Sequence, residues 1–210
     1  MKLTQNQSQI PIYAAVVFAG AMYPLAAEAH LNSTGMGPIY DGLMHFLMSP
    51  EDLVPVLALA LLSGLRGATY GRRTLFVLPA AWLLGGLLGL AASASNGNAI
   101  MSAVWFLLLG GLLAADAKLS LRVTTALACL LGLYHGYLNG AGLGLTFSSA
   151  AVLLGLIFAV FVLIALAAAF VVQLRASWAR IAVRVAGSWI FASGLLLMGW
   201  AVRGVRGRVF

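Results

Sequence analysis

Residues 149–174 read SAAVLLGLIFAVFVLIALAAAFVVQL and contain no acidic or basic residue. A run of about 20 apolar residues is long enough to cross the hydrocarbon of a bilayer as a helix. In lipid, only helices and closed barrels can satisfy all their backbone hydrogen bonds. The stretch therefore predicts a transmembrane helix and places the chain among integral membrane proteins.

The composition of the whole chain agrees with this class. It is 62% hydrophobic and 8% charged, with a mean hydropathy of +1.02, whereas soluble domains carry roughly 25% charged residues. The net charge of +7 could suit nucleic acid. However, the basic residues lie in short turns between apolar runs, as membrane topology predicts. We therefore expect a lipid bilayer and no nucleic acid as partner.

Five further apolar runs predict the rest of the fold, at roughly 51–66, 73–93, 99–116, 119–138 and 183–202. We expect an all-α polytopic membrane helix bundle of about six transmembrane helices, occupying residues 51–210. Small residues such as Gly85, Gly86 and Gly89 are expected to let neighbouring helices approach closely. The single cysteine, Cys129, lies inside an apolar run, so no intrachain disulfide can form.

The N-terminus has the pattern of a signal peptide over residues 1–29. Lys2 gives a positive start, residues 10–25 an apolar core, and Ala27-Glu28-Ala29 an A-x-A cleavage pattern. An uncleaved anchor helix is the alternative. Cleavage would leave His30 as the first residue. Residues 30–50 would then lie in the periplasm, and the chain in a bacterial inner membrane.

The basic turns give the orientation, because Lys and Arg are enriched in cytoplasmic loops. The turns after the first, third and fifth runs carry Arg66, Arg72, Arg73, Lys118, Arg122, Arg175, Arg180 and Arg184, whereas the other turns carry none. We expect these basic turns in the cytoplasm, with Asp116 paired to Lys118 or Arg122. Arg203, Arg206 and Arg208 in the tail would fall outside, against the rule.

Polar chemistry concentrates in residues 40–52, YDGLMHFLMSPED. This window holds His45 and three of the five acidic residues of the chain. Ionisable groups near a bilayer are costly unless they are wet, paired or bound to an ion. We expect a short amphipathic or re-entrant helix at 37–48, with Ser49 and Pro50 starting the next helix. The window is a candidate functional site.

Topology brings this window close to the end of the fourth run. His135 and Asn139 are spaced i, i+4 on one helical face, and so are Asp41 and His45. On a continuous helix Asp52, eleven residues after Asp41, returns to nearly the same azimuth. Facing pairs of this kind could form a divalent metal site. Imidazole with carboxylate suits Ni²⁺, Co²⁺, Zn²⁺ or Cu²⁺.

Two further residues are candidate ligands, and each candidate has a structural alternative. Glu51 follows Pro50 directly, and His30 could chelate through its imidazole and a new terminal amine. The acidic residues at 51 and 52 could instead only stabilise the N-terminus of a helix, which carries a partial positive charge. Asp41 could be a solvated acid, His45 an interfacial histidine and Asn139 a helix cap.

These segments resemble a known family. Residues 45–59, HFLMSPEDLVPVLAL, are similar to the H-x-x-x-G-x-D-H-L-L-x-x-L-A-L segment of the HupE/UreJ family. Residues 134–140, YHGYLNG, are similar to its later F-H-G-x-x-H-G segment. The resemblance implies an inner-membrane protein that carries nickel or cobalt and is associated with hydrogenase or urease maturation.

The chain departs from the family pattern at the same segments. His45 and His135 match family histidines, and Glu51 falls where the family has aspartate. Asp52 and Asn139 stand where the resemblance implies histidines, so two imidazoles have become oxygen donors. Such a site would prefer harder metal ions, bind nickel with lower affinity and be less selective for it.

We therefore expect a secondary permease for a divalent transition-metal ion, nickel or cobalt, with a periplasm-facing site and no organic cofactor. We do not expect an enzyme, since the sequence shows no Ser-His-Asp or Cys-His nucleophile arrangement. Copper and zinc are further candidates for the ion. The alternatives are a non-transporting accessory protein, binding metal or a partner at its periplasmic face, and a haem protein with His45 and His135 as axial ligands.

Overall fold

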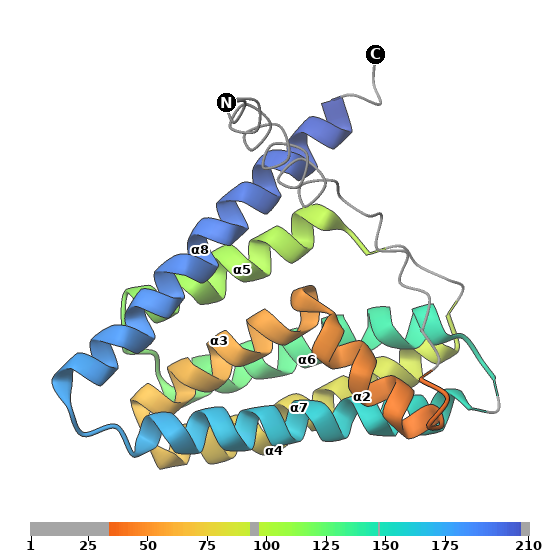
Figure 1. Cartoon of the computed structure of the whole chain (residues 1–210), viewed down its shortest axis with the longest axis horizontal. Helices are drawn as coiled ribbons and strands as arrows, with labels where there is room; N and C mark the ends of the chain where they lie inside the picture. Colours follow the sequence, from red (N-terminus) through yellow and green to blue (C-terminus); the bar gives the residue numbers. More distant parts are fainter. Residues whose placement is uncertain (1–33, 93–96, 147, 207–210) are drawn as a thin grey trace, which may run out of the picture. The chain divides into compact units, whose positions relative to one another are not determined.

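The computed structural model describes residues 34–92, 97–146 and 148–206, and these contain seven helices and no strand (Figure 1). The helices are α2 (Pro38–Met48), α3 (Pro50–Arg66), α4 (Ala68–Leu90), α5 (Ala99–Ala114), α6 (Leu121–Leu143), α7 (Ser149–Val172) and α8 (Ser177–Arg206). The all-α prediction is confirmed. The expected signal peptide and His30 lie outside the described residues.

Each of the six expected apolar runs forms one helix, from α3 to α8. By length and composition, α4, α7 and α8 can each cross a membrane alone, and α2 with α3 can do so as one bent pair. The apolar α5 is shorter, at 16 residues. The 23-residue α6 is long enough, but polar residues such as His135 and Asn139 lower its hydropathy. The protein is a multi-pass helical membrane protein.

Helices α4 and α6 pack backbone against backbone. Gly132, Gly136 and Gly140 recur every fourth residue on α6, and a Cβ at each would overlap a backbone carbonyl of α4. In the opposite direction, Gly85 and Gly89 of α4 face carbonyls of α6. Small residues permit this close approach of membrane helices. The packing role expected for Gly85 and Gly89 is thus confirmed. The three glycines of α6 form the other side of the same contact.

A second close contact fixes α2 on α7. A Cβ on Gly42 of α2 would overlap the carbonyl of Val152, and one on Gly155 of α7 would overlap the carbonyl of Ile39. The two backbones therefore touch where α2 crosses the beginning of α7. This contact fixes the position of α2, the helix that carries His45.

The chain breaks sharply between α2 and α3. Ser49 has an extended backbone (φ −99°, ψ 92°), Pro50 is the first residue of α3, and the helix axes differ by 75°. Proline disfavours helical geometry at the preceding residue, which explains the break. The assumption of one continuous helix from Asp41 to Asp52 was therefore wrong, and the two residues do not share a face.

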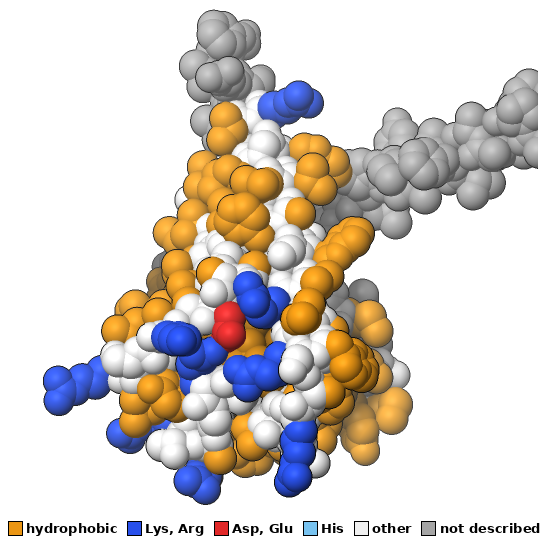
Figure 2. Space-filling model, turned by 90° about the vertical axis from the view of Figure 1, so that its left-hand side faces the viewer, with side chains coloured by type: hydrophobic (Ala, Val, Ile, Leu, Met, Phe, Trp, Pro, Cys, Tyr) orange, Lys and Arg blue, Asp and Glu red, His pale blue; other side chains and the backbone are white. Residues whose placement is uncertain are grey.

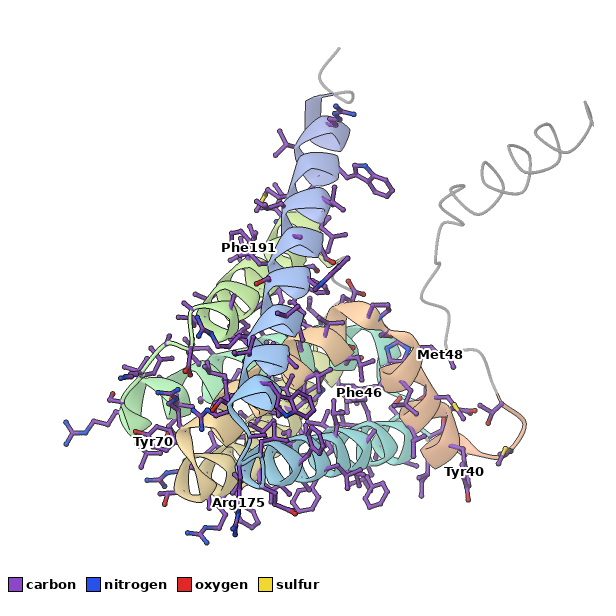
Figure 3. The ribbon with its side chains drawn as sticks, turned by 60° about the vertical axis from the view of Figure 1, so that its left-hand side comes forward. Tyr40, Phe46, Met48, Tyr70, Arg175 and Phe191 are labelled. Carbon is purple, nitrogen blue, oxygen red and sulfur yellow. The ribbon has the colours of Figure 1, made fainter. Side chains whose placement is uncertain are left out.

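Helices α5 and α8 form a pair of their own. A Cβ on Gly110 would crowd the backbone of Phe191, whose position on α8 beside α5 is visible in Figure 3. A Cβ on Gly187 or Gly194 of α8 would likewise crowd the backbone of α5. The rest of α8 is largely exposed, including Trp189 at 73%. Exposed apolar side chains of this kind suit contact with lipid.

Basic side chains gather around the ends of α3, α5 and α7 and the beginnings of α4, α6 and α8, which we call the basic end (Figure 2). Here Arg66 forms an ion pair with Asp116. Arg180 donates to the carbonyl of Leu65, and Arg184 to that of Ala114. The expected pairing of Asp116 with Lys118 or Arg122 was therefore wrong. The carboxylate turns toward α3 and ties that helix to the end of α5.

Candidate functional site

Four of the sequence candidates meet beside the α2–α3 break. His45 lies in the last turn of α2 and Asp52 in the first turn of α3. His135 and Asn139 lie one turn apart on α6. The break at Ser49 lets α2 and α3 approach α6 from different directions. Residues separated by more than 80 positions in the sequence thus come into hydrogen-bond contact.

Asp52 and His135 form the buried centre of the site. Their side chains are joined by a hydrogen bond of 2.7 Å between Asp52 Oδ1 and His135 Nδ1, and the two residues are 5% and 2% exposed. A carboxylate accepts, so Nδ1 carries the proton and donates it. The other ring nitrogen of a neutral His135, Nε2, then carries a lone pair. This is the arrangement by which a carboxylate orients a histidine that binds a metal.

Asn139 joins this pair to His45. Its Nδ2 group donates to Asp52 Oδ2 (3.0 Å) and to the backbone carbonyl of His135 (2.8 Å). With both amide hydrogens in use, its Oδ1 must accept, and it lies 2.9 Å from His45 Nε2. His45 therefore carries a proton on Nε2. The four side chains form a single chain of hydrogen bonds from α2 to α6, which we call the polar chain: His45, Asn139, Asp52 and His135.

The free nitrogen of His135 lies among aromatic rings. Trp82 of α4 stacks on the imidazole with ring centroids 5.6 Å apart, Tyr134 meets it edge-on at 5.1 Å, and Trp105 of α5 lies at 6.2 Å. His135 Nε2 and the indole nitrogens of Trp82 and Trp105 are buried without a hydrogen-bond partner among the described residues. Buried polar atoms are rarely left unpaired. The open nitrogen therefore marks a position where a ligand or water would gain a bond.

The other described candidates lie outside the polar chain. Asp41 Oδ1 accepts from the backbone nitrogen and the hydroxyl of Thr34, at 2.6 and 2.7 Å. Glu51 is exposed and accepts a long bond of 3.4 Å from Ser102. Within the described part of the chain, no three His, Cys, Asp or Glu side chains are close enough to hold one metal ion together. The site offers one oriented imidazole nitrogen in a polar chain, rather than a closed ligand cage.

Sequence reasoning missed the aromatic walls of this site. Trp82 and Trp105 lie in apolar runs, where a tryptophan is usually only a packing residue. One signal was available: Gly136 follows His135 directly and recurs with Gly132 and Gly140. That spacing brings α4 against α6 and places the indole of Trp82 on the imidazole.

Fold and site together define a class: multi-pass helical membrane proteins with a buried histidine–carboxylate pair between their helices. The family described as HupE / UreJ protein matches residues 17–197, which cover most of the chain. The chain belongs to the HupE/UreJ family, and the resemblance seen in residues 45–59 and 134–140 is confirmed. Comparisons with curated proteins and with solved structures gave no match.

Proposed function

We propose that this protein is a secondary permease that carries a divalent transition-metal ion, nickel or cobalt, across the bacterial inner membrane from the periplasm. The observation that supports this most strongly is the bonding state of His135. Its Nδ1 is held by Asp52, its Nε2 has no partner among the described residues, and the residue is buried between membrane helices. A neutral imidazole in this state is a preferred ligand for these ions.

The remaining residues of the polar chain would assist the ion. Asp52 would fix the ring orientation of His135 and supply a negative charge across the imidazole ring from the ion. His45 lies at the outer end of the polar chain, on the last turn of α2. Its proton on Nε2 leaves Nδ1 with a lone pair, so a rotation of this ring could pass an ion inward. We infer that His45 receives the ion and that His135 holds it.

The driving force would be electrical. No nucleotide-binding motif occurs in the sequence. Moving a divalent cation inward down a potential of about 100 mV is worth roughly 4.6 kcal/mol, about 2.3 for each charge. This is more than enough to concentrate the ion several hundredfold, since each 1.4 kcal/mol is about a factor of ten.

A second function has one observation in its favour. Every nitrogen and oxygen of the Asp52 and Asn139 side chains already has a hydrogen-bond partner. A satisfied network can hold helices together without carrying anything. The alternative is therefore an accessory protein that binds metal or a partner at its periplasmic face, in support of metalloenzyme maturation.

Uptake into proteoliposomes tests the two functions. Vesicles with an inside-negative potential should accumulate nickel or cobalt with the wild-type protein, and His135→Ala should abolish the flux. Calorimetry on the same preparations measures binding separately. Binding without flux in the wild type would support the accessory protein. Neither binding nor flux with any divalent metal ion would contradict the permease and would favour an accessory protein that binds a partner.

A further inference from the structure

A groove opens between α4 and α7 near the basic end, apart from the polar chain. Its volume is about 290 Å³. Small residues, Gly71 on α4 and Ala165 and Ala168 on α7, leave the space, and Leu75 forms part of its apolar wall. Both helices are long and apolar enough to cross a membrane. The large side chains beside the groove, Phe76 and Leu166, are 65% and 67% exposed, so this surface faces lipid.

The polar residues of the groove lie at one end only. Arg72 is in the second turn of α4, and Gln173 directly follows the last residue of α7. Helix ends of this kind lie at the headgroup level of a bilayer, where long basic side chains extend toward water. The groove therefore runs from a cationic mouth into an apolar trough, which matches the polarity of a phospholipid.

In the described part of the chain, the guanidinium of Arg72 lacks the contacts with protein oxygens that three other arginines of the basic end make. Arg66, Arg180 and Arg184 each bond to a protein oxygen. Within the described residues, the side chain of Arg72, like that of the adjacent Arg73, has no hydrogen bond or ion pair. An arginine side chain that makes no polar contact within the protein has all its donors available for a phosphate group. Arg72 is such a residue, at the mouth of an apolar groove.

We propose that this groove binds an anionic phospholipid, with one acyl chain between α4 and α7 and its phosphate on Arg72. The charge of the mouth selects a lipid with net negative charge, because a zwitterionic headgroup offsets its own phosphate. The apolar trough distinguishes a lipid from a free phosphate ion, which would gain nothing from Leu75 or Ala165. Basic pockets between membrane helices are a known form of lipid recognition. This site does not depend on the metal-transport proposal.

The test is retention of lipid by purified, delipidated protein in detergent, measured by native mass spectrometry. The probes are phosphatidylglycerol and phosphatidylcholine, with soluble glycerophosphoglycerol as competitor. The wild type should retain phosphatidylglycerol in preference, and Arg72→Gln should weaken retention about fivefold, the effect of one basic residue near anionic lipid. The matched control is Arg73→Gln, because Arg73 is adjacent and exposed but does not line the groove.

A second pair of variants tests the groove itself without changing charge. Ala165→Phe fills the trough and should lower retention of phosphatidylglycerol, whereas Ala80→Phe on the exposed face of α4 should not. Equal losses in Arg72→Gln and Arg73→Gln would show only diffuse attraction and would overturn the proposal. Full retention by a folded Ala165→Phe, or competition by glycerophosphoglycerol as strong as by the lipid, would also overturn it. Should Ala165→Phe fail to fold, the arginine pair alone decides.

Discussion

Asp52 and His135 are 83 residues apart in the sequence and 2.7 Å apart in the fold, between Oδ1 and Nδ1. Both are almost completely buried. A carboxylate this close sets the tautomer of the imidazole and raises its strength as a ligand. In the proposed permease, Asp52 would therefore act on an ion through His135, rather than as a ligand of its own.

Removing the charge of Asp52 should weaken the site without emptying it. In Asp52→Asn, the imidazole keeps its position but loses the carboxylate that orients and polarises it. We expect the affinity for nickel to fall roughly 10–100-fold, the usual effect of losing such a partner. Isothermal titration calorimetry in detergent measures this.

Glu51→Gln is the matched control for that variant. It removes the same charge from the adjacent residue, but Glu51 is exposed and outside the polar chain. Its affinity for nickel should equal that of the wild type. Equal losses in the two variants would mean that only the general negative potential near the break matters.

Asn139→His should increase the affinity for nickel, because imidazole is a better ligand for this ion than an amide oxygen. The new ring would lie between His45 and Asp52, which Asn139 now joins. Flux should not rise with affinity, since an ion that is held too firmly leaves slowly. Calorimetry and proteoliposome uptake on the same preparation separate the two effects. A variant with unchanged affinity and unchanged flux would show that position 139 is remote from the ion.

Gly136→Ala should destabilise the protein by about 1–3 kcal/mol, the typical cost of overpacking. The added Cβ would overlap the Trp82 carbonyl and force α4 away from α6. Thermal unfolding in detergent measures the change. Gly142→Ala is the control on the same helix, because a Cβ there meets nothing within 4 Å. It should be neutral or stabilise by roughly 0.5–1 kcal/mol, as alanine favours a helix, so equal melting temperatures would contradict the packing argument.

Cysteine labelling should show Arg73 in the cytoplasm and the end of α6 in the periplasm. On a Cys129→Ala background, a membrane-impermeant reagent added to intact spheroplasts should label Gly142→Cys. The same reagent should label Arg73→Cys only after the membrane is opened. Labelling of position 73 from the outside would reverse the orientation and with it the proposed direction of transport.

The helices of this protein were predictable because each apolar run has to satisfy its backbone hydrogen bonds internally when it lies in lipid. The run 149–174 corresponds to α7 at Ser149–Val172. The meeting of His45 and Asp52 with His135 was also predictable, because alternating spans bring their segments to one end of the bundle. Both arguments need only length, hydropathy and the order of the chain.

The bonding within the site was not predictable, because it depends on one bend and one side-chain amide. The 75° break before Pro50 turns Asp52 off the face shared by Asp41 and His45. Sequence spacing treats Asn139 as one candidate ligand among several, whereas its amide joins His45 to Asp52 and fixes the tautomer of His45. The direction of a hydrogen bond depends on such details, and the periodicity of the sequence does not indicate it.

The helix break before Asp52 also has a consequence for how long an ion can remain. The polar chain contains a single acidic residue, Asp52, which lies in the first turn of α3. The positive end of that helix, worth about half a unit charge, already offsets part of the carboxylate. A divalent ion on His135 would therefore remain undercompensated by at least one charge, in a place with little water. In the proposed permease, this imbalance would keep the residence time of the ion short and would favour passage over storage.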